Sequence, residues 1–229
     1  QQERSFDDIR AAARRSWNDD LGRIRVEGGT DAQKKVFYTG LYHALIHPNV
    51  LSDVNGEYPA MESAEIRTAE GNRYTVFSLW DTYRNLHQLM TLVYPERQLE
   101  MVRSMIGMYK EWGWLPKWEL YGRETFTMEG DPAIPVIVDT WMKGLRDFDM
   151  DAAYEAMRKS ATTPGAQNRM RPDIDPYVEK GYVPLGFYAR DLSGDNSVSH
   201  ALEYYIADHA LSLLADSLGR REDAALFRN

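Results

Sequence analysis

The stretch VSHALEYYIADHALSLLADSL, residues 198–218, carries apolar side chains on nearly every face of a helix. A helix with this pattern is buried on most sides within a larger helical fold. Gly219 suits a helix C-terminus, and another helix begins at Arg220. That last helix reaches barely two turns before Asn229, so we expect a helical domain that is truncated at its C-terminal end.

Helix signals recur upstream of this stretch. Ser5 with Asp8 forms a capping box before apolar residues spaced by three and four, and Thr30 with Gln33 forms a second one. We expect the first helix to face a core and to pack against the second as an antiparallel hairpin. Helices are predicted over residues 5–24, 30–47, 78–93, 95–112, 131–144, 149–162 and 173–180. The pattern predicts an all-α fold of helical hairpins, and it fits part of an α/α toroid better than a four-helix bundle, whose loops are short.

One segment interrupts the helices. Residues 49–77 have no helical period, and two turn sequences, Asn55-Gly56 and Gly71-Asn72, lie between short extended runs. Such turns join antiparallel strands. We therefore predict a small β-hairpin insertion in the helical scaffold.

Composition excludes several kinds of partner. The formal net charge of the 229 residues is -8, and the charges are interspersed without a basic block. This argues against nucleic acid and anionic membranes as partners. No apolar run approaches the roughly 20 residues that span a bilayer. The absence of cysteine excludes disulfides and thiolate metal sites, and leaves the compartment open.

The stretch 113–129 is irregular and rich in aromatic residues. Trp112, Trp114, Trp118 and Tyr121 lie in it or at its border. Long irregular connections are often functional, and sugar sites need aromatic faces beside carboxylates or amides. The alternative is that these rings fill the seam between helix pairs.

Two aspartates have a structural explanation as well as a chemical one. Asp81 is the third residue of a helix that Ser78 caps, so a capping box accounts for it. Asp131 precedes Pro132 and fits an N-cap. The residue pattern alone leaves both explanations open.

Other reaction classes find little support. His43 and His47 are four residues apart on one helix, but a zinc site needs a third ligand that the sequence does not identify. There is no GxSxG elbow, no Walker A loop and no dinucleotide-binding fingerprint after a strand.

The segment FSLWDTYR, residues 77–84, contains a WDTxR sequence at the start of a predicted helix. This segment resembles a hallmark of glycoside hydrolase family 92. Further segments resemble the family in its order and cover almost the whole chain: FYTGLYHALIHPN (37–49), DVNGEY (53–58), GWLPKW (113–118), MEGDPAIPVIVDTWMKG (128–144), GYVP (181–184) and VSHALEYYIADHALSLLA (198–215).

The resemblance implies an activity and an architecture. It implies an exo-acting, calcium-dependent α-mannosidase that inverts the anomeric centre and trims mannose-containing glycans. Its catalytic domain would be an (α/α)6 toroid preceded by a β-sandwich domain, with residues 1–229 forming the N-terminal portion of the toroid. It also implies a periplasmic or secreted protein.

Carried over residue by residue, the resemblance names a candidate site. Trp80 and Asp81 would line the pocket for the terminal mannose, and Arg84 would orient Asp81. Asp131 and Glu203 resemble family positions near the pocket, without individual roles. The resemblance assigns no calcium ligand in this chain.

This chain also departs from the family. Ala207 precedes Asp208 where the family's LEYxxDD pattern has a first aspartate. The YTEG segment with the general acid, the GNEP segment and the GND segment near the general base do not occur. We therefore expect the acid and base beyond residue 229, and the isolated chain to be inactive.

Two other hypotheses stay open. One is a non-catalytic carbohydrate-binding remnant of the same domain that keeps Trp80 and Asp81. The other is a different α/α-toroid exo-glycosidase, which would share the architecture but not the WDTxR sequence.

Overall fold

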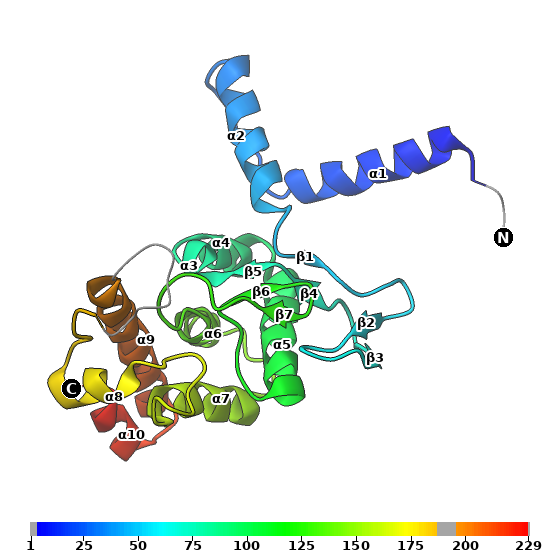
Figure 1. Cartoon of the computed structure of the whole chain (residues 1–229). Coiled ribbons are helices and arrows are strands. Elements are labelled where there is room, and N and C mark those ends of the chain that lie inside the picture. Colours follow the sequence, from blue (N-terminus) through cyan, green and yellow to red (C-terminus); the bar gives the residue numbers. More distant parts are fainter. Residues whose placement is uncertain (1–3, 187–195, 229) are drawn as a thin grey trace. The chain divides into compact units, whose positions relative to one another are not determined.

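The computed structural model describes residues 4–186 and 196–228, which are mostly helical with short antiparallel sheets (Figure 1). The chain forms two compact units, Gln1–His47 and Pro48–Asn229. The helices are α1 (Phe6–Leu21), α2 (Asp31–Ala44), α3 (Leu79–Thr82), α4 (Leu86–Val93), α5 (Pro95–Trp112), α6 (Ala133–Met142), α7 (Met150–Thr162), α8 (Ile174–Lys180), α9 (Ser197–Ser217) and α10 (Arg221–Leu226). The strands are β1 (Asn49–Val50), β2 (Glu57–Pro59), β3 (Ile66–Thr68), β4 (Tyr74–Thr75), β5 (Phe77–Ser78), β6 (Trp118–Leu120) and β7 (Arg123–Glu124).

Both predicted capping boxes are confirmed in the first unit. The Asp8 backbone N–H donates to Ser5 Oγ at 3.2 Å, and the Ser5 N–H donates to the Asp8 carboxylate at 3.1 Å. Thr30 and Gln33 make the same reciprocal pair at the start of α2. Local sequence therefore sets where these two helices begin.

The packing expected of these two helices is wrong. The rings of Trp17 and Tyr42 lie 4.7 Å apart, and the Tyr38 hydroxyl donates to the Ile24 carbonyl oxygen. Away from these contacts α1 and α2 diverge, so they do not form an antiparallel hairpin (Figure 1). No residue of α1 is buried, so the first unit by itself gives the apolar stripe of this helix no core.

The insertion before α3 consists of strands, but their pairing differs from the prediction. Neither the Asn55-Gly56 turn nor the Gly71-Asn72 turn joins two strands that pair with each other. Instead β2 pairs with β3, and β1 pairs with β4 outside them. The two pairs are nested, because the chain goes out through β1 and β2 and returns through β3 and β4.

A three-stranded sheet forms where the sequence predicted an irregular loop. Strand β6 pairs with β5 on one side and with β7 on the other. Between β4 and β5, Val76 has φ +62°, which is strained for a β-branched residue. The buried Glu119 carboxylate accepts from the Val76 N–H at 3.0 Å and from the Thr75 hydroxyl at 2.8 Å. Glu119 on β6 thus holds the strained backbone that leads into α3.

The single helix predicted over residues 78–93 is interrupted. Helix α3 ends at Thr82, and α4 starts at Leu86. The Gln88 side chain donates to the Tyr83 carbonyl oxygen at 2.7 Å, and Thr82 Oγ1 lies 3.0 Å from His87 Nε2. Gln88 thus satisfies a backbone carbonyl at the break, and Thr82 and His87 join the two helices across it.

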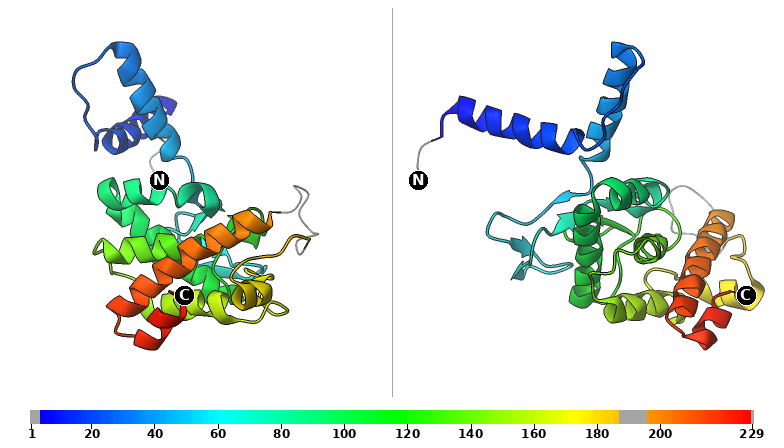
Figure 2. Two further views of the ribbon diagram at one scale, coloured as in Figure 1. Left: turned by 90° about the vertical axis from the view of Figure 1, so that its left-hand side faces the viewer. Right: turned by 180° about the vertical axis from the view of Figure 1, so that it is seen from behind.

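The most enclosed helix is α6 rather than α9. Figure 1 and the rear view in Figure 2 show α6 end-on between α5 and α9, and it also contacts α4. Six of its ten residues are buried. Helix α9 was expected to be buried on most sides, but it keeps an exposed apolar face. That face consists of Val198, Leu202, Tyr205, Ile206 and Leu213. Among the described residues, none of the helices has the length and apolarity that crossing a membrane requires.

Candidate functional site

The Glu203 carboxylate on α9 accepts hydrogen bonds from three residues of the segment 80–84. Glu203 accepts from Trp80 Nε1 at 3.1 Å, from the Tyr83 hydroxyl at 2.7 Å and from Arg84 Nη2 at 2.9 Å. The structure thus brings together three of the predicted site residues, Trp80, Arg84 and Glu203. We call Trp80, Tyr83, Arg84 and Glu203 the Glu203 cluster.

Aromatic rings support the guanidinium of this cluster. Arg84 Cζ lies 4.4 Å from the Trp80 ring centroid and 4.8 Å from that of Tyr83, which are cation–π distances. Burial and the hydrogen bond to Glu203 raise the pKa of Tyr83 to about 12, so its hydroxyl stays a donor at neutral pH. The Arg84 side chain is 44% exposed and the Glu203 side chain 12%. The cluster therefore has a covered carboxylate and an accessible cation.

Asp81 lies in the same short helix but outside this hydrogen-bonded group. Its carboxylate is exposed and accepts from the Ser78 hydroxyl. The structure corrects the expectation that Arg84 orients Asp81, because the guanidinium pairs with Glu203 instead. The predicted capping box is wrong as well, since Ser78 makes no side-chain bond to the α3 backbone. A carboxylate has about four acceptor positions, so Asp81 keeps capacity for a ligand.

A row of hydrogen-bonded side chains links α3 to α4, α5 and α6. Thr82 Oγ1 lies 3.0 Å from His87 Nε2, and His87 Nδ1 lies 3.0 Å from Gln98 Oε1. Gln98 in turn donates to Thr140 on α6 at 2.9 Å. Burial lowers the pKa of His87 to about 4, so its ring is neutral at physiological pH. This histidine is a structural support for the WDT residues.

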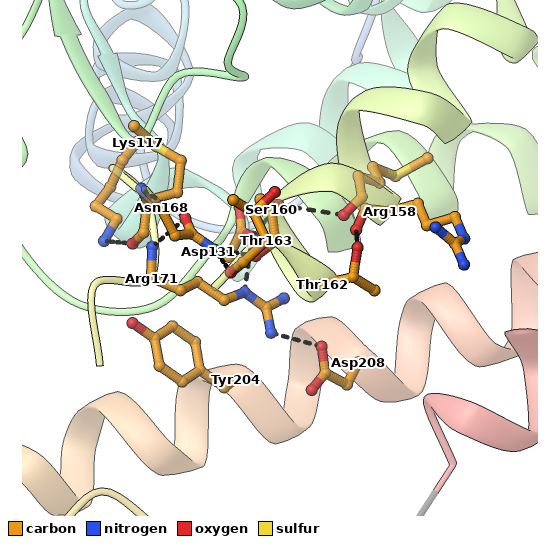
Figure 3. Close-up of polar contacts among 12 residues, drawn as sticks. Lys117, Asp131, Arg158, Ser160, Thr162, Thr163, Asn168, Arg171, Tyr204 and Asp208 are labelled. Atoms are coloured by element: carbon orange, nitrogen blue, oxygen red, sulfur yellow. Dashed lines mark hydrogen bonds and ion pairs between the residues drawn. The ribbon is translucent and has the colours of Figure 1, made fainter. Parts of the chain in front are cut away.

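Asp131 lies in a different environment, which Figure 3 shows. It is buried, and its carboxylate accepts from Arg171 Nε at 2.9 Å and from the Ser160 hydroxyl at 2.5 Å. Arg171 Nη1 donates to Asp208 on α9 at 2.7 Å. The N-cap role predicted for Asp131 is wrong, because the side chain makes no cap bond and turns to Arg171. We call Asp131, Ser160, Arg171 and Asp208 the Arg171 cluster.

Further groups surround the buried guanidinium. Arg171 Cζ lies 4.8 Å from the centroid of the Tyr204 ring, and the Tyr204 hydroxyl donates to Asp173 at 2.7 Å. Lys117 is also buried, and its ammonium group donates to the Met170 carbonyl oxygen (Figure 3). Burial lowers the pKa of Lys117. The contacts of Tyr204 tie the loop before α8 to α9, and Lys117 ties the same loop to the residue before β6.

Gly130 connects the two clusters. It precedes Asp131 and has φ +78°, which favours glycine. A Cβ atom at this position would come within 2.5 Å of Glu203 Cβ. The segment before α6 therefore places Asp131 against Arg171 and also packs its backbone against Glu203.

The aromatic residues of the stretch 113–129 differ in their exposure. Trp114 is buried, and the Lys159 ammonium lies 4.5 Å from its ring centroid, as expected for a seam filler. The Trp112 and Phe126 rings lie 6.2 Å apart. Tyr121 is 59% exposed with φ +50°. Tyr121 is the ring of this stretch that is most accessible to a ligand.

Sequence reasoning missed two residues that organise these clusters. Tyr83 lies three residues after Trp80 in the segment FSLWDTYR. This spacing, about one helical turn, could have indicated that the two side chains share a partner. Arg171 carried no signal, because its acidic partners are 40 and 37 residues away in the sequence.

The whole chain, residues 1–229, matches the model of the "Glycosyl hydrolase family 92 catalytic domain". The chain belongs to glycosyl hydrolase family 92. Among solved structures, this family 92 chain is similar to the family GH92 α-mannosidase BT3965 from Bacteroides thetaiotaomicron in complex with mannoimidazole. The TM-score is 0.88 at 35% sequence identity, over 99% of this chain and 28% of that one.

Two other proteins extend the comparison. The family GH92 inverting mannosidase BT2199 from Bacteroides thetaiotaomicron gives a TM-score of 0.87 at 32% identity, over 99% of this chain and 30% of that one. An uncharacterized secreted glycosidase of Arthroderma benhamiae is 26% identical over 98% of this chain and 26% of its own length. This family 92 chain thus spans less than a third of the length of these relatives.

Proposed function

We propose that this family 92 chain supplies the mannose-binding part of an exo-acting α-mannosidase that removes terminal α-mannosyl residues from glycans. The match of the whole chain to the catalytic-domain family carries the proposal. The similar structures described as α-mannosidases, one of them with mannoimidazole bound, support mannose as the sugar.

Asp81 and Arg84 would bind the sugar through its hydroxyl groups. The exposed Asp81 carboxylate can accept from two neighbouring hydroxyls, and the accessible Arg84 guanidinium can donate to their oxygens. Trp80 would contribute an apolar edge, because its indole N–H is already donated to Glu203. These residues would bind and orient the terminal mannose.

Cleavage itself would need two further carboxyl groups. An inverting glycosidase places its acid and base about 6.5–9.5 Å apart, on opposite sides of the sugar. Glu203 is a poor candidate for either role, since its carboxylate already accepts three hydrogen bonds. We place the acid and base in the part of the enzyme beyond residue 229. We expect the reaction to invert the anomeric centre because the resemblance to family 92 implies it.

Calcium dependence is part of the proposal and comes from the family resemblance. Within residues 4–186 and 196–228, no three His, Cys, Asp or Glu side chains come together in a way that could hold a metal. The calcium ligands would come from elsewhere in the complete enzyme.

The complete enzyme would be larger than this chain. We propose that residues 1–229 are the N-terminal portion of an (α/α)6 toroid that follows a β-sandwich domain, and that the exposed apolar face of α9 packs against later helices of the ring. The description of one relative as secreted supports a periplasmic or secreted location.

Hydrolysis of an aryl α-mannoside tests this function. It would be measured with calcium and with a chelator, for the 229-residue chain and for a version extended at both ends to the length of the Bacteroides relatives. We expect hydrolysis by the extended protein alone, dependent on calcium and lost on Asp81→Ala. Activity in the short chain would mean that an acid and a base lie within residues 1–229. Mannoside binding without hydrolysis by the extended protein would instead indicate a non-catalytic carbohydrate-binding module.

A further inference from the structure

The carboxylate of Glu203 is used almost completely by protein donors. Oε1 accepts from Trp80 and Arg84, and Oε2 accepts from Tyr83. All three donors come from one short segment, 119 to 123 residues earlier in the sequence. With its side chain 12% exposed, Glu203 has little capacity left for a sugar hydroxyl or for a proton in transfer.

Arg84, in contrast, has donors to spare. A guanidinium carries five N–H donors, and the contact with Glu203 uses Nη2. Its side chain is held on one side by the carboxylate and over two rings by cation–π contacts, yet it is 44% exposed. A cation fixed in this way can meet a ligand without losing further side-chain entropy.

We propose that Glu203 is a positioning residue of the mannose-binding site, which acts by fixing the Arg84 guanidinium and the Trp80 indole beside Asp81 and does not touch the sugar. The inference rests on the proposed function, because it explains how the residues of the proposed mannose-binding site are held in place. Asp81 on α3 and Arg84 just beyond the end of α3 are three residues apart and both exposed, so together they offer an acceptor and a donor for sugar hydroxyls.

The backbone at Gly130 supports this role independently. Any side chain at this position would meet Glu203, since a Cβ would lie 2.5 Å from Glu203 Cβ. Gly144 provides a matched comparison. It also has positive φ, at +91°, but a Cβ there would meet nothing within 4 Å. Alanine variants at Gly130 and Gly144 therefore distinguish the effect of displacing Glu203 from the effect of backbone strain alone.

The test compares variants of the full-length enzyme that carries this chain. Glu203→Gln keeps the shape of the side chain and removes its charge, and Asp216→Asn makes the same change at an exposed position of α9. We expect Glu203→Gln to lower kcat/KM for an aryl α-mannoside by about 100-fold, as small misplacements of binding groups do. Asp216→Asn is expected to match the wild type.

Two readouts distinguish positioning from other roles. Both limbs of the pH profile of kcat/KM should persist in Glu203→Gln, whereas loss of one limb would identify a general acid or base and overturn the proposal. In a double-mutant cycle, adding Arg84→Gln to Glu203→Gln should cause little further loss. Fully additive losses would contradict action through Arg84.

Gly130→Ala is expected to reproduce the loss of kcat/KM, and Gly144→Ala to leave it within about threefold of the wild type. If both alanine variants behave alike, displacement of Glu203 is not what matters at Gly130. Equal activity of Glu203→Gln and Asp216→Asn would also overturn the inference.

One measurement keeps this inference separate from the proposed function. The indole N–H resonance of Trp80, assigned with Trp80→Phe, should shift in Glu203→Gln and stay in place in Asp216→Asn. A wild-type enzyme that does not hydrolyse the mannoside would contradict the proposed function. An unshifted Trp80 resonance would contradict the positioning role whether or not the enzyme turns over.

Discussion

Two acidic residues of α9, five positions apart, serve two different clusters. Glu203 accepts from Trp80, Tyr83 and Arg84, and the cation of this group is 44% exposed. Asp208 pairs with Arg171, whose side chain is completely buried. Both clusters join α9 to distant segments, but water reaches the cation in only one of them.

The difference supports the proposal that the Glu203 cluster, rather than the Arg171 cluster, belongs to the sugar-binding site. In the Arg171 cluster, the guanidinium is shared by two carboxylates, and Ser160 and Tyr177 occupy further acceptor positions. Removing one partner from such a buried pair is costly, because the remaining charge is left buried and uncompensated. Near the Glu203 cluster, the exposed carboxylate of Asp81 has Ser78 as its hydrogen-bond partner. Spare polar capacity at an accessible position is what a binding site needs.

The largest effect is expected at Arg171. Arg171→Met leaves the Asp131 and Asp208 carboxylates without their cation in a buried position. Loss of one partner from a buried ion pair costs about 3–5 kcal/mol. Chemical denaturation should show a decrease of that size in the free energy of unfolding. A decrease below about 1 kcal/mol would show that the cluster contributes little to the fold.

A second effect is expected from His87, the buried support of Thr82. Its pKa in the folded chain is about 4, against 6.5 ordinarily, so only the unfolded chain takes up a proton between these values. The stability that neutral His87 contributes is therefore present above pH 6.5 and lost as the pH falls to 4, by about 3 kcal/mol in total. His87→Gln should flatten the pH dependence of unfolding in this range.

The matched control for this pH experiment is His209→Gln, because His209 is exposed on α9. It is expected to leave the pH dependence of unfolding close to that of the wild type. An equal flattening by both variants would show that burial of His87 is not its cause.

The smallest effect is expected at Arg158. Its ion pair with Asp223 has an N–O distance of 3.1 Å, but its side chain is 47% exposed. Exposed pairs contribute about 0–1 kcal/mol because water and salt screen them. Arg158→Met should therefore lower the free energy of unfolding by less than about 1 kcal/mol, and a loss as large as that of Arg171→Met would remove the distinction between buried and exposed pairs.

Local signals in the sequence predicted most helix positions. The capping boxes at Ser5 and Thr30 are present, and Asp149 caps α7 through the Ala152 N–H as its position suggested. These features depend on residues three or four apart. The break between α3 and α4 was not predictable in this way, because it depends on the buried chain from Thr82 through His87 to α6.

Non-local contacts explain the other differences. The nesting of β1 with β4 around β2 and β3 depends on partners that no turn sequence specifies. The resemblance to family 92 named Trp80, Arg84 and Glu203, but nothing in the sequence indicated that the last accepts hydrogen bonds from the first two. Asp131 was named as a position near the same pocket, and its pairing with Arg171, 40 residues away, carried no signal in the sequence.

The most direct test of the account measures two quantities on two matched variants of the full-length enzyme. Asp81→Asn and Asp131→Asn each replace one carboxylate by an amide, and each is assayed for kcat/KM on an aryl α-mannoside and for the free energy of unfolding. Asp81→Asn is expected to lower kcat/KM by about 100-fold or more, with unfolding within about 0.5 kcal/mol of the wild type. Asp131→Asn is expected to lower the free energy of unfolding by about 2 kcal/mol and to leave kcat/KM of the folded enzyme nearly unchanged. The reverse result, with Asp81→Asn unstable but active and Asp131→Asn stable but inactive, would contradict the separation of a binding cluster from a structural one.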